Sequence, residues 1–188
     1  MKKISLLFSV CCVMVACNQS PKSRAFDAFK KKIPMLKLPY KKACSDTVGY
    51  LKLNIPDSIL KKYAPPGTTG IIGMIKDTDF YTAIVYSVKG DIDYPVVQTY
   101  NAEGDSLNNI GIMEGTCCGN SANCSGTFWG EISKDLTISL HDSEKVFEMD
   151  KAGNYSTIKF KNINNTQVYN ITNDGYLRLK NAGSGAVK

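Results

Sequence analysis

The residues best suited to chemistry are three cysteines in one loop. Cys117, Cys118 and Cys124 lie in the stretch EGTCCGNSANCSGTFWGE, residues 114–131, which is rich in Gly, Ser and Asn. A cysteine can form a disulfide, bind a metal or attack a substrate as a thiolate. The spacing C-C-x5-C lacks the paired C-x2-C pattern of zinc sites. We therefore expect no metal and no cofactor in this loop.

A nucleophilic cysteine needs a base, and the chain contains one histidine, His141. It follows the apolar run LTISL at the end of a predicted strand, and nothing in the sequence brings it to the cysteine loop. The chain also lacks the G-x-S-x-G, H-E-x-x-H and Walker-type patterns. We expect a non-catalytic protein with no catalytic residues. The alternative is a hydrolase or thiol-dependent enzyme that uses the 117–124 cysteine loop and His141.

The first 20 residues have the three parts of an export signal. Lys2 and Lys3 precede an apolar run from Ile4 to Ala16, and the small Ala16 precedes Cys17. The run has thirteen residues, fewer than the roughly 20 that a helix needs to cross a bilayer. This pattern predicts a cleaved signal peptide over residues 1–16.

The sequence Met14-Val15-Ala16-Cys17 resembles the lipobox of bacterial lipoproteins, and the resemblance covers only the first twenty residues. It implies that Cys17 becomes the acylated first residue, carrying a diacylglyceryl group and an acyl chain such as palmitate, and that the membrane is a partner through this lipid. Two or three acyl chains make a stable anchor. By analogy with Gram-negative sorting, Asn18 favours the outer membrane, on its periplasmic or surface face. An ordinary secretory signal is the alternative.

Export would place the remaining cysteines where disulfides persist. Besides Cys17 these are Cys44, Cys117, Cys118 and Cys124, and four cysteines allow three pairings. A bond between the adjacent residues 117 and 118 would strain an eight-membered ring. We expect Cys44 to pair with one of these two and Cys124 with the other, and reduced thiols are the alternative.

Charge is distributed unevenly along the chain. From Asn18 to Lys42 there are eight basic residues and one acidic residue, a balance of +7, whereas residues 43–188 have 13 basic and 16 acidic residues, a balance of −3. The folded domain therefore lacks the basic surface of a nucleic-acid-binding protein. The basic segment can lie against anionic headgroups or form a solvated tether.

We expect residues 17–42 to be an acylated basic tether with an apolar arm, and residues 43–188 to be a single β-rich domain. Residues 18–24 have the composition of a linker, and the spacing of Phe26 and Phe29 predicts one short helical turn. The segment 33–40 reads as an extended apolar arm that packs on the domain, because apolar arms rarely stay in water.

The domain is predicted to be mainly β. Runs rich in Val, Ile, Thr, Tyr and Phe predict strands near 48–55, 69–75, 80–88, 94–101, 107–113, 126–132, 135–140, 145–149, 155–161, 166–171 and 175–179. A helical turn capped by Asp57 is expected over 57–63. An antiparallel meander of this kind must close or stack, which predicts a lipocalin-like or half-open barrel or a two-sheet sandwich.

Three turn sequences support the meander. TYNAEGDS, EMDKAGNY and YNITNDGY each place Asn or Asp ahead of a Gly that can adopt a positive φ in a tight reversal. They lie at residues 99–106, 148–155 and 169–176. Each predicts a hairpin.

Other residues suggest binding or modification. Phe128 and Trp129 can be core anchors or, if exposed, can contact a sugar or a protein. The sequences DTV, DSI and DSL resemble the O-glycosylation sequence of exported Bacteroidota proteins, which implies Thr47, Ser58 and Ser106 as acceptors. We expect a non-catalytic protein of the cell envelope that binds an envelope protein, a glycan or an apolar ligand, and no nucleic acid.

Overall fold

The structure is a computed structural model that describes residues 19–113, 119–120 and 124–187. Its elements follow the chain in this order: α2 (Pro21–Lys30), β1 (Tyr40–Ala43), α3 (Asp57–Tyr63), β2 (Thr68–Asp77), β3 (Tyr81–Val88), β4 (Tyr94–Asn101), β5 (Ser106–Gly111), β6 (Gly119–Asn120), β7 (Cys124–Ile132), β8 (Thr137–Met149), β9 (Tyr155–Ile171) and β10 (Leu177–Val187). Neither helix has the length and hydrophobicity needed to cross a bilayer within this part of the chain.

The strands form two antiparallel sheets. One has four strands in the order β2-β3-β4-β5, and the other has six, in the order β1-β7-β8-β9-β10 with β6 beside β7. Consecutive strands are neighbours in both sheets, as a meander requires, and among the described strands only β1 joins from far away in the sequence. The protein is therefore mainly β, and its described strands close no barrel.

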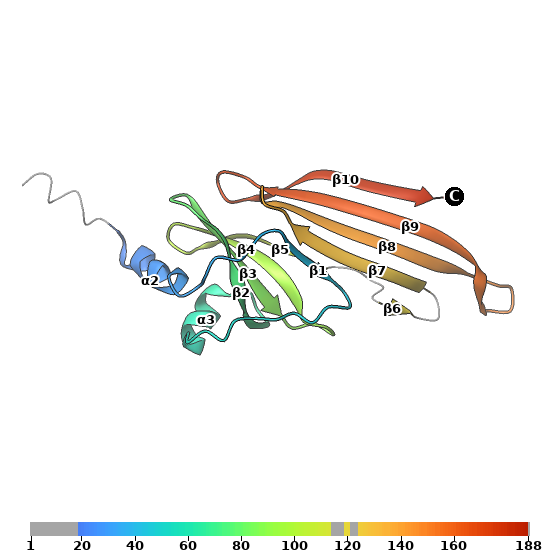
Figure 1. The fold of residues 1–188 in the computed structure, drawn as a ribbon, viewed down its shortest axis with the longest axis horizontal. Coiled ribbons are helices and arrows are strands. Elements are labelled where there is room, and N and C mark those ends of the chain that lie inside the picture. The colour runs from blue at the N-terminus through green and yellow to red at the C-terminus, as the bar shows by residue number, and fades with distance from the viewer. Residues whose placement is uncertain (1–18, 114–118, 121–123, 188) are drawn as a thin grey trace, which may run out of the picture.

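The four-stranded sheet is buried on both faces. On one face it packs under α2 and α3, and on the other against the near half of the six-stranded sheet (Figure 1). Every residue of β3 is buried as a result. This explains why its sequence, YTAIVYSV, is almost continuously apolar rather than alternating. The domain thus has three layers: helices, four-stranded sheet and six-stranded sheet.

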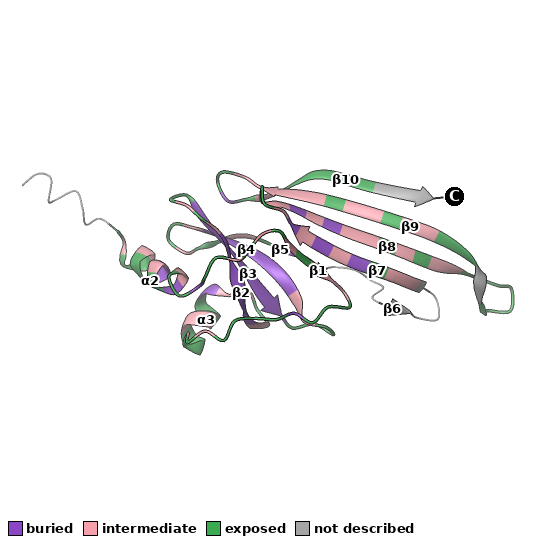
Figure 2. Ribbon diagram, in the orientation of Figure 1, coloured by how far each residue is buried: buried purple, intermediate pink, exposed green. Residues whose placement is uncertain are grey.

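The six-stranded sheet extends beyond this core. Residues 142–149 of β8 and 155–165 of β9 form what we call the projecting hairpin, at the end of the molecule opposite the helices (Figures 1 and 2). None of its side chains with a described burial is buried. Its sequence mixes Lys, Glu, Asn and Ser with apolar residues. Both faces of the hairpin can therefore stay in contact with water.

The three predicted turns are confirmed. Gly104, Gly153 and Gly175 have φ of 83°, 85° and 84° and close the hairpins β4–β5, β8–β9 and β9–β10. Polar side chains complete the turns, because Asn101 accepts bonds from the N–H of Glu103 and Asp105, each at 2.9 Å.

Several element boundaries were predicted wrongly. The strands expected at 135–140 and 145–149 are one strand, β8, which begins at Thr137, and those expected at 155–161 and 166–171 are one strand, β9. The polar runs between them suggested loops, but a sheet exposed on both faces accepts polar residues. The segment 48–55 is not a strand and has a single bridge, from Leu51 to Ile71.

The segment before β1 forms a helix and an arm that pack on the domain. Helix α2 begins at Pro21, and the hydroxyl of Ser20 caps it by accepting a bond from the N–H of Ser23 at 3.0 Å. It is longer than the single turn expected. After it, Ile33 is buried, and Leu36, Leu38 and Tyr40 pack against the core between the sheets. The arm therefore packs on the domain.

Helix α3 begins differently from the prediction. Its N-cap is Pro56, and Asp57 is the first helical residue and makes no capping hydrogen bond. The Asp57 carboxylate still lies in the first turn, where the helix dipole favours negative charge.

Candidate functional site

Trp129 and His141 form the centre of an aromatic cluster on the six-stranded sheet. Their chain neighbours Phe128 and Leu140 are buried in the core. Alternate residues of a strand point to opposite faces, so Trp129 and His141 lie on the face turned away from the four-stranded sheet, which we call the outer face.

The cluster crosses four strands. Trp129 of β7 is paired with Ala43 of β1 and His141 of β8, and His141 is paired with Thr166 of β9. The indole and imidazole rings stack with their centroids 3.7 Å apart and an interplanar angle of 19°. Lys41 Nζ lies 4.0 Å from the centre of the Trp129 ring.

Polar groups hold both ends of this stack. The Thr166 hydroxyl lies 3.3 Å from His141 Nδ1, and Lys41 Nζ lies 3.8 Å from a carboxylate oxygen of Glu131. Burial and then the Lys41 charge lower the pKa of His141, while Glu131 opposes them. The imidazole is therefore neutral at pH 7, and it can form a hydrogen bond with the Thr166 hydroxyl.

This geometry does not support catalysis by His141. Its described hydrogen-bond partner is a threonine hydroxyl, and its ring is stacked on an indole. Cys124 is paired with Val146, five positions along β8 from His141, which is about 17 Å along a strand. Cys117 and Cys118 lie outside the described residues.

Trp129 is also poorly placed to stack on a sugar. His141 covers its ring on β8, and the Lys41 ammonium lies over it from β1. A ligand on the outer face would therefore contact the edge of the Trp129 ring and the polar groups around it. Phe128, the other predicted binding residue, is 4% exposed and belongs to the core.

On the opposite face of the sheet, a cavity of about 280 Å³ lies where the core ends. Phe128 and Leu140 form its apolar part, and Asp142, Asn165 and Gln167 form its polar part. Burial and the nearby Glu144 raise the pKa of Asp142, and a hydrogen bond with Asn165 opposes this shift. This volume is at the lower end of the range of small-molecule sites.

The projecting hairpin carries three of the large apolar residues that this sheet exposes, and Leu179 of β10 is another. Phe147 and Phe160 pack edge to face with centroids 6.3 Å apart, and Lys145 Nζ lies 5.0 Å from the centre of the Phe160 ring. Met149, Tyr155 and Phe160 are 57%, 40% and 40% exposed. The hairpin therefore exposes apolar side chains next to its polar turn, residues 150–154.

The remaining predicted sites are those for disulfide bonding, glycosylation and lipid attachment. Cys44 continues β1 beside β7, where its N–H donates to the Phe128 carbonyl at 3.0 Å, and it is disulfide-bonded. The side chain of its partner lies outside the described residues, so the pairing stays a prediction. Thr47, Ser58 and Ser106 are all exposed. Cys17 lies outside the described residues.

The sequence pattern did not reveal that Lys41 contacts Trp129, that Glu131 pairs with Lys41 or that Thr166 contacts His141. Lys41 precedes Trp129 by 88 positions, and only the pairing of β1 with β7 brings them together. Comparisons with protein-family models, curated proteins and solved structures find no match to this chain.

Proposed function

We propose that the protein is a lipid-anchored protein of the bacterial cell envelope with a non-catalytic binding role, and that the projecting hairpin is its binding surface. The lipobox at Cys17 supports the anchor. The observation that carries the binding role is the long hairpin, which lies outside the core and still exposes Met149, Tyr155 and Phe160. Large exposed apolar residues that gather in one place favour an interaction site.

A protein partner fits this surface better than an apolar small molecule. The space between the sheets is filled by buried side chains, and Tyr155 and Phe160 of the hairpin are exposed. Aromatic and Met side chains are enriched at protein–protein interfaces. A glycan remains the alternative partner for the polar outer face.

The anchor and the location belong to the same proposal. Asn18 next to the lipid-bearing cysteine favours the outer membrane. Exposure of Thr47, Ser58 and Ser106 is compatible with their glycosylation after export. Fatty-acid labelling and membrane fractionation of the wild-type chain and of Cys17→Ser test the anchor, and the variant should lose both the label and the membrane association.

Site-specific photo-crosslinking in the cell tests the binding surface. A photoreactive amino acid in place of Phe160 should give a discrete crosslinked product. The matched control is Phe80, an aromatic residue that is 75% exposed at the β2–β3 turn. Equal products from both positions, or none from Phe160, would contradict the proposed binding surface without affecting the anchor.

A further inference from the structure

We infer that the helix layer of the domain lies against an anionic phospholipid surface, with three cations of α2 and its C-terminal end as the contact. This basic face consists of Arg24, Lys31 and Lys32, which are all exposed. The inference rests on the proposed lipid anchor at Cys17. It goes further because it assigns a second contact with the membrane and therefore an orientation of the domain relative to the membrane.

The chain leaves little room between the anchor and the helix. Three residues separate Cys17 from Pro21, where α2 begins. A fully extended chain spans at most about 3.6 Å per residue, so the first Cα atom of α2 lies within about 14 Å of the Cα atom of Cys17. An acylated Cys17 would therefore hold α2 at the headgroup layer.

The outward face of α2 is positively charged. Phe26 and Phe29 point into the core and are 0% and 2% exposed. At 100° per residue, Arg24 and Lys31 lie on the opposite side of the helix axis, with the small Ala28 between them. The one carboxylate of α2, Asp27, is paired with Lys30, and the described ion pairs of the chain include none of the three cations.

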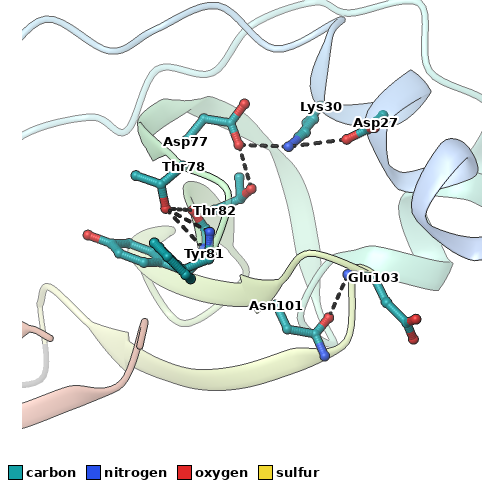
Figure 3. A network of polar contacts seen from close by, with 9 residues as sticks. Asp27, Lys30, Asp77, Thr78, Tyr81, Thr82, Asn101 and Glu103 are labelled. Atoms are coloured by element: carbon teal, nitrogen blue, oxygen red, sulfur yellow. Dashed lines mark hydrogen bonds and ion pairs between the residues drawn. The ribbon is translucent and has the colours of Figure 1, made fainter. Parts of the chain in front are cut away.

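Other lysines of the same segment form ion pairs with carboxylates of the domain. Lys30 Nζ lies 3.2 Å from Asp27 and 2.8 Å from Asp77, and Asp77 also accepts a bond from Thr82 at 2.7 Å (Figure 3). Lys22 forms an ion pair with Asp105. These contacts and the buried phenylalanines fix α2 on the domain, so the direction in which the basic face points is also fixed.

Helix α3 extends the positive surface. Tyr63 of α3 stacks on Phe29 of α2 with centroids 4.8 Å apart, so the two helices are neighbours. Lys61 and Lys62 are exposed on α3, against one exposed carboxylate, Asp57. Because the projecting hairpin lies at the opposite end of the molecule (Figure 1), contact through the helices would direct the hairpin away from the membrane.

Vesicle binding without the lipid anchor tests the basic face directly. The chain from residue 17 onward with Cys17→Ser should partition onto phosphatidylcholine vesicles that contain 30% phosphatidylglycerol, and high salt should release it. Each cation close to an anionic surface contributes about fivefold. The triple variant Arg24→Gln, Lys31→Gln, Lys32→Gln should therefore partition about a hundredfold less.

The matched control carries the same charge change elsewhere. Arg178, Lys134 and Lys180 are exposed on the β-sheet part of the chain, and their change to Gln should reduce partitioning by much less than a hundredfold. Equal losses in the two triple variants, or equal binding to vesicles without phosphatidylglycerol, would overturn the inference. Circular dichroism confirms that each variant is folded. Fatty-acid labelling of the wild-type chain tests the anchor separately, so a failure of one proposal is distinguishable from a failure of the other.

Discussion

The imidazole of His141 stacks on the indole of Trp129, with ring centroids 3.7 Å apart. The two residues are directly opposite each other on β7 and β8, which is the arrangement in which cross-strand pairs stabilise a sheet most. The stack therefore has a structural role on the outer face of this sheet.

Acid should weaken this part of the sheet. The pKa of His141 is lowered by burial and by Lys41, so the folded state binds a proton less readily than the unfolded state, whose pKa is about 6.5. Stability from this group is complete above pH 6.5 and is lost as the pH falls through the lower folded pKa. NMR titration follows the C2 proton of the single histidine. Lys41→Met should raise this pKa, and an unchanged value would contradict the assigned cause.

The turns show what local sequence could predict. Asn101, Asp150 and Thr172 each accept or donate hydrogen bonds within their own turn, a few residues ahead of a glycine with positive φ. These interactions involve neighbours in sequence, so the pattern of residues is sufficient to predict them.

The lengths of the strands and the contacts between residues far apart in the sequence could not be predicted from local sequence. The run HDSEK, residues 141–145, is polar because β8 leaves the core at this point, not because the strand ends. Whether a polar run is a loop or an exposed strand depends on what lies over it. The cluster around Trp129 depends on the pairing of β1 with β7, which no local pattern encodes.

Gly130 should be intolerant of a side chain. A Cβ atom at this position would lie 2.1 Å from the carbonyl oxygen of Ile112 and 2.4 Å from its Cγ2 atom, so the two sheets would have to separate. We expect Gly130→Ala to lower the free energy of unfolding by about 3 kcal/mol, at the upper end of overpacking effects. Chemical denaturation measures the change. At Gly183, an added Cβ atom has no neighbour within 4 Å, so Gly183→Ala serves as the control and should change stability by less than about 0.5 kcal/mol.

Tyr100 should contribute more to stability than Tyr86. Its hydroxyl donates to the Tyr63 carbonyl at 2.6 Å and lies 2.7 Å from the Tyr86 hydroxyl, and both tyrosines are buried. Tyr100→Phe would remove the partner of two buried polar groups, at about 1–3 kcal/mol, whereas Tyr86→Phe leaves the bond to Tyr63 intact. Denaturation of both variants and of the double variant measures the order, and an equal cost for each would contradict it.

The same pair predicts alkaline sensitivity. Burial raises the pKa of both Tyr86 and Tyr100, so the folded state keeps its protons at a pH where the unfolded chain loses them. The stability that these groups provide is complete below about pH 10 and declines as the pH rises above it. Thermal unfolding measured from pH 8 to 11 should show this decline, and the double Phe variant should show less of it.

The projecting hairpin should open without unfolding the core. Phe147 and Phe160 contact each other at its tip, and residues 142–149 contribute no buried side chain, so this hairpin lacks the packing that protects β3. Backbone amides of 143–149 and 159–163 should exchange with solvent faster than those of 83–87. Phe147→Ala removes an aromatic contact that contributes about 1 kcal/mol, and it should speed exchange at the tip while the denaturation midpoint changes little. Exchange that rises equally in β3 would show that the hairpin and the core unfold together, which the separation of the two in this structure argues against.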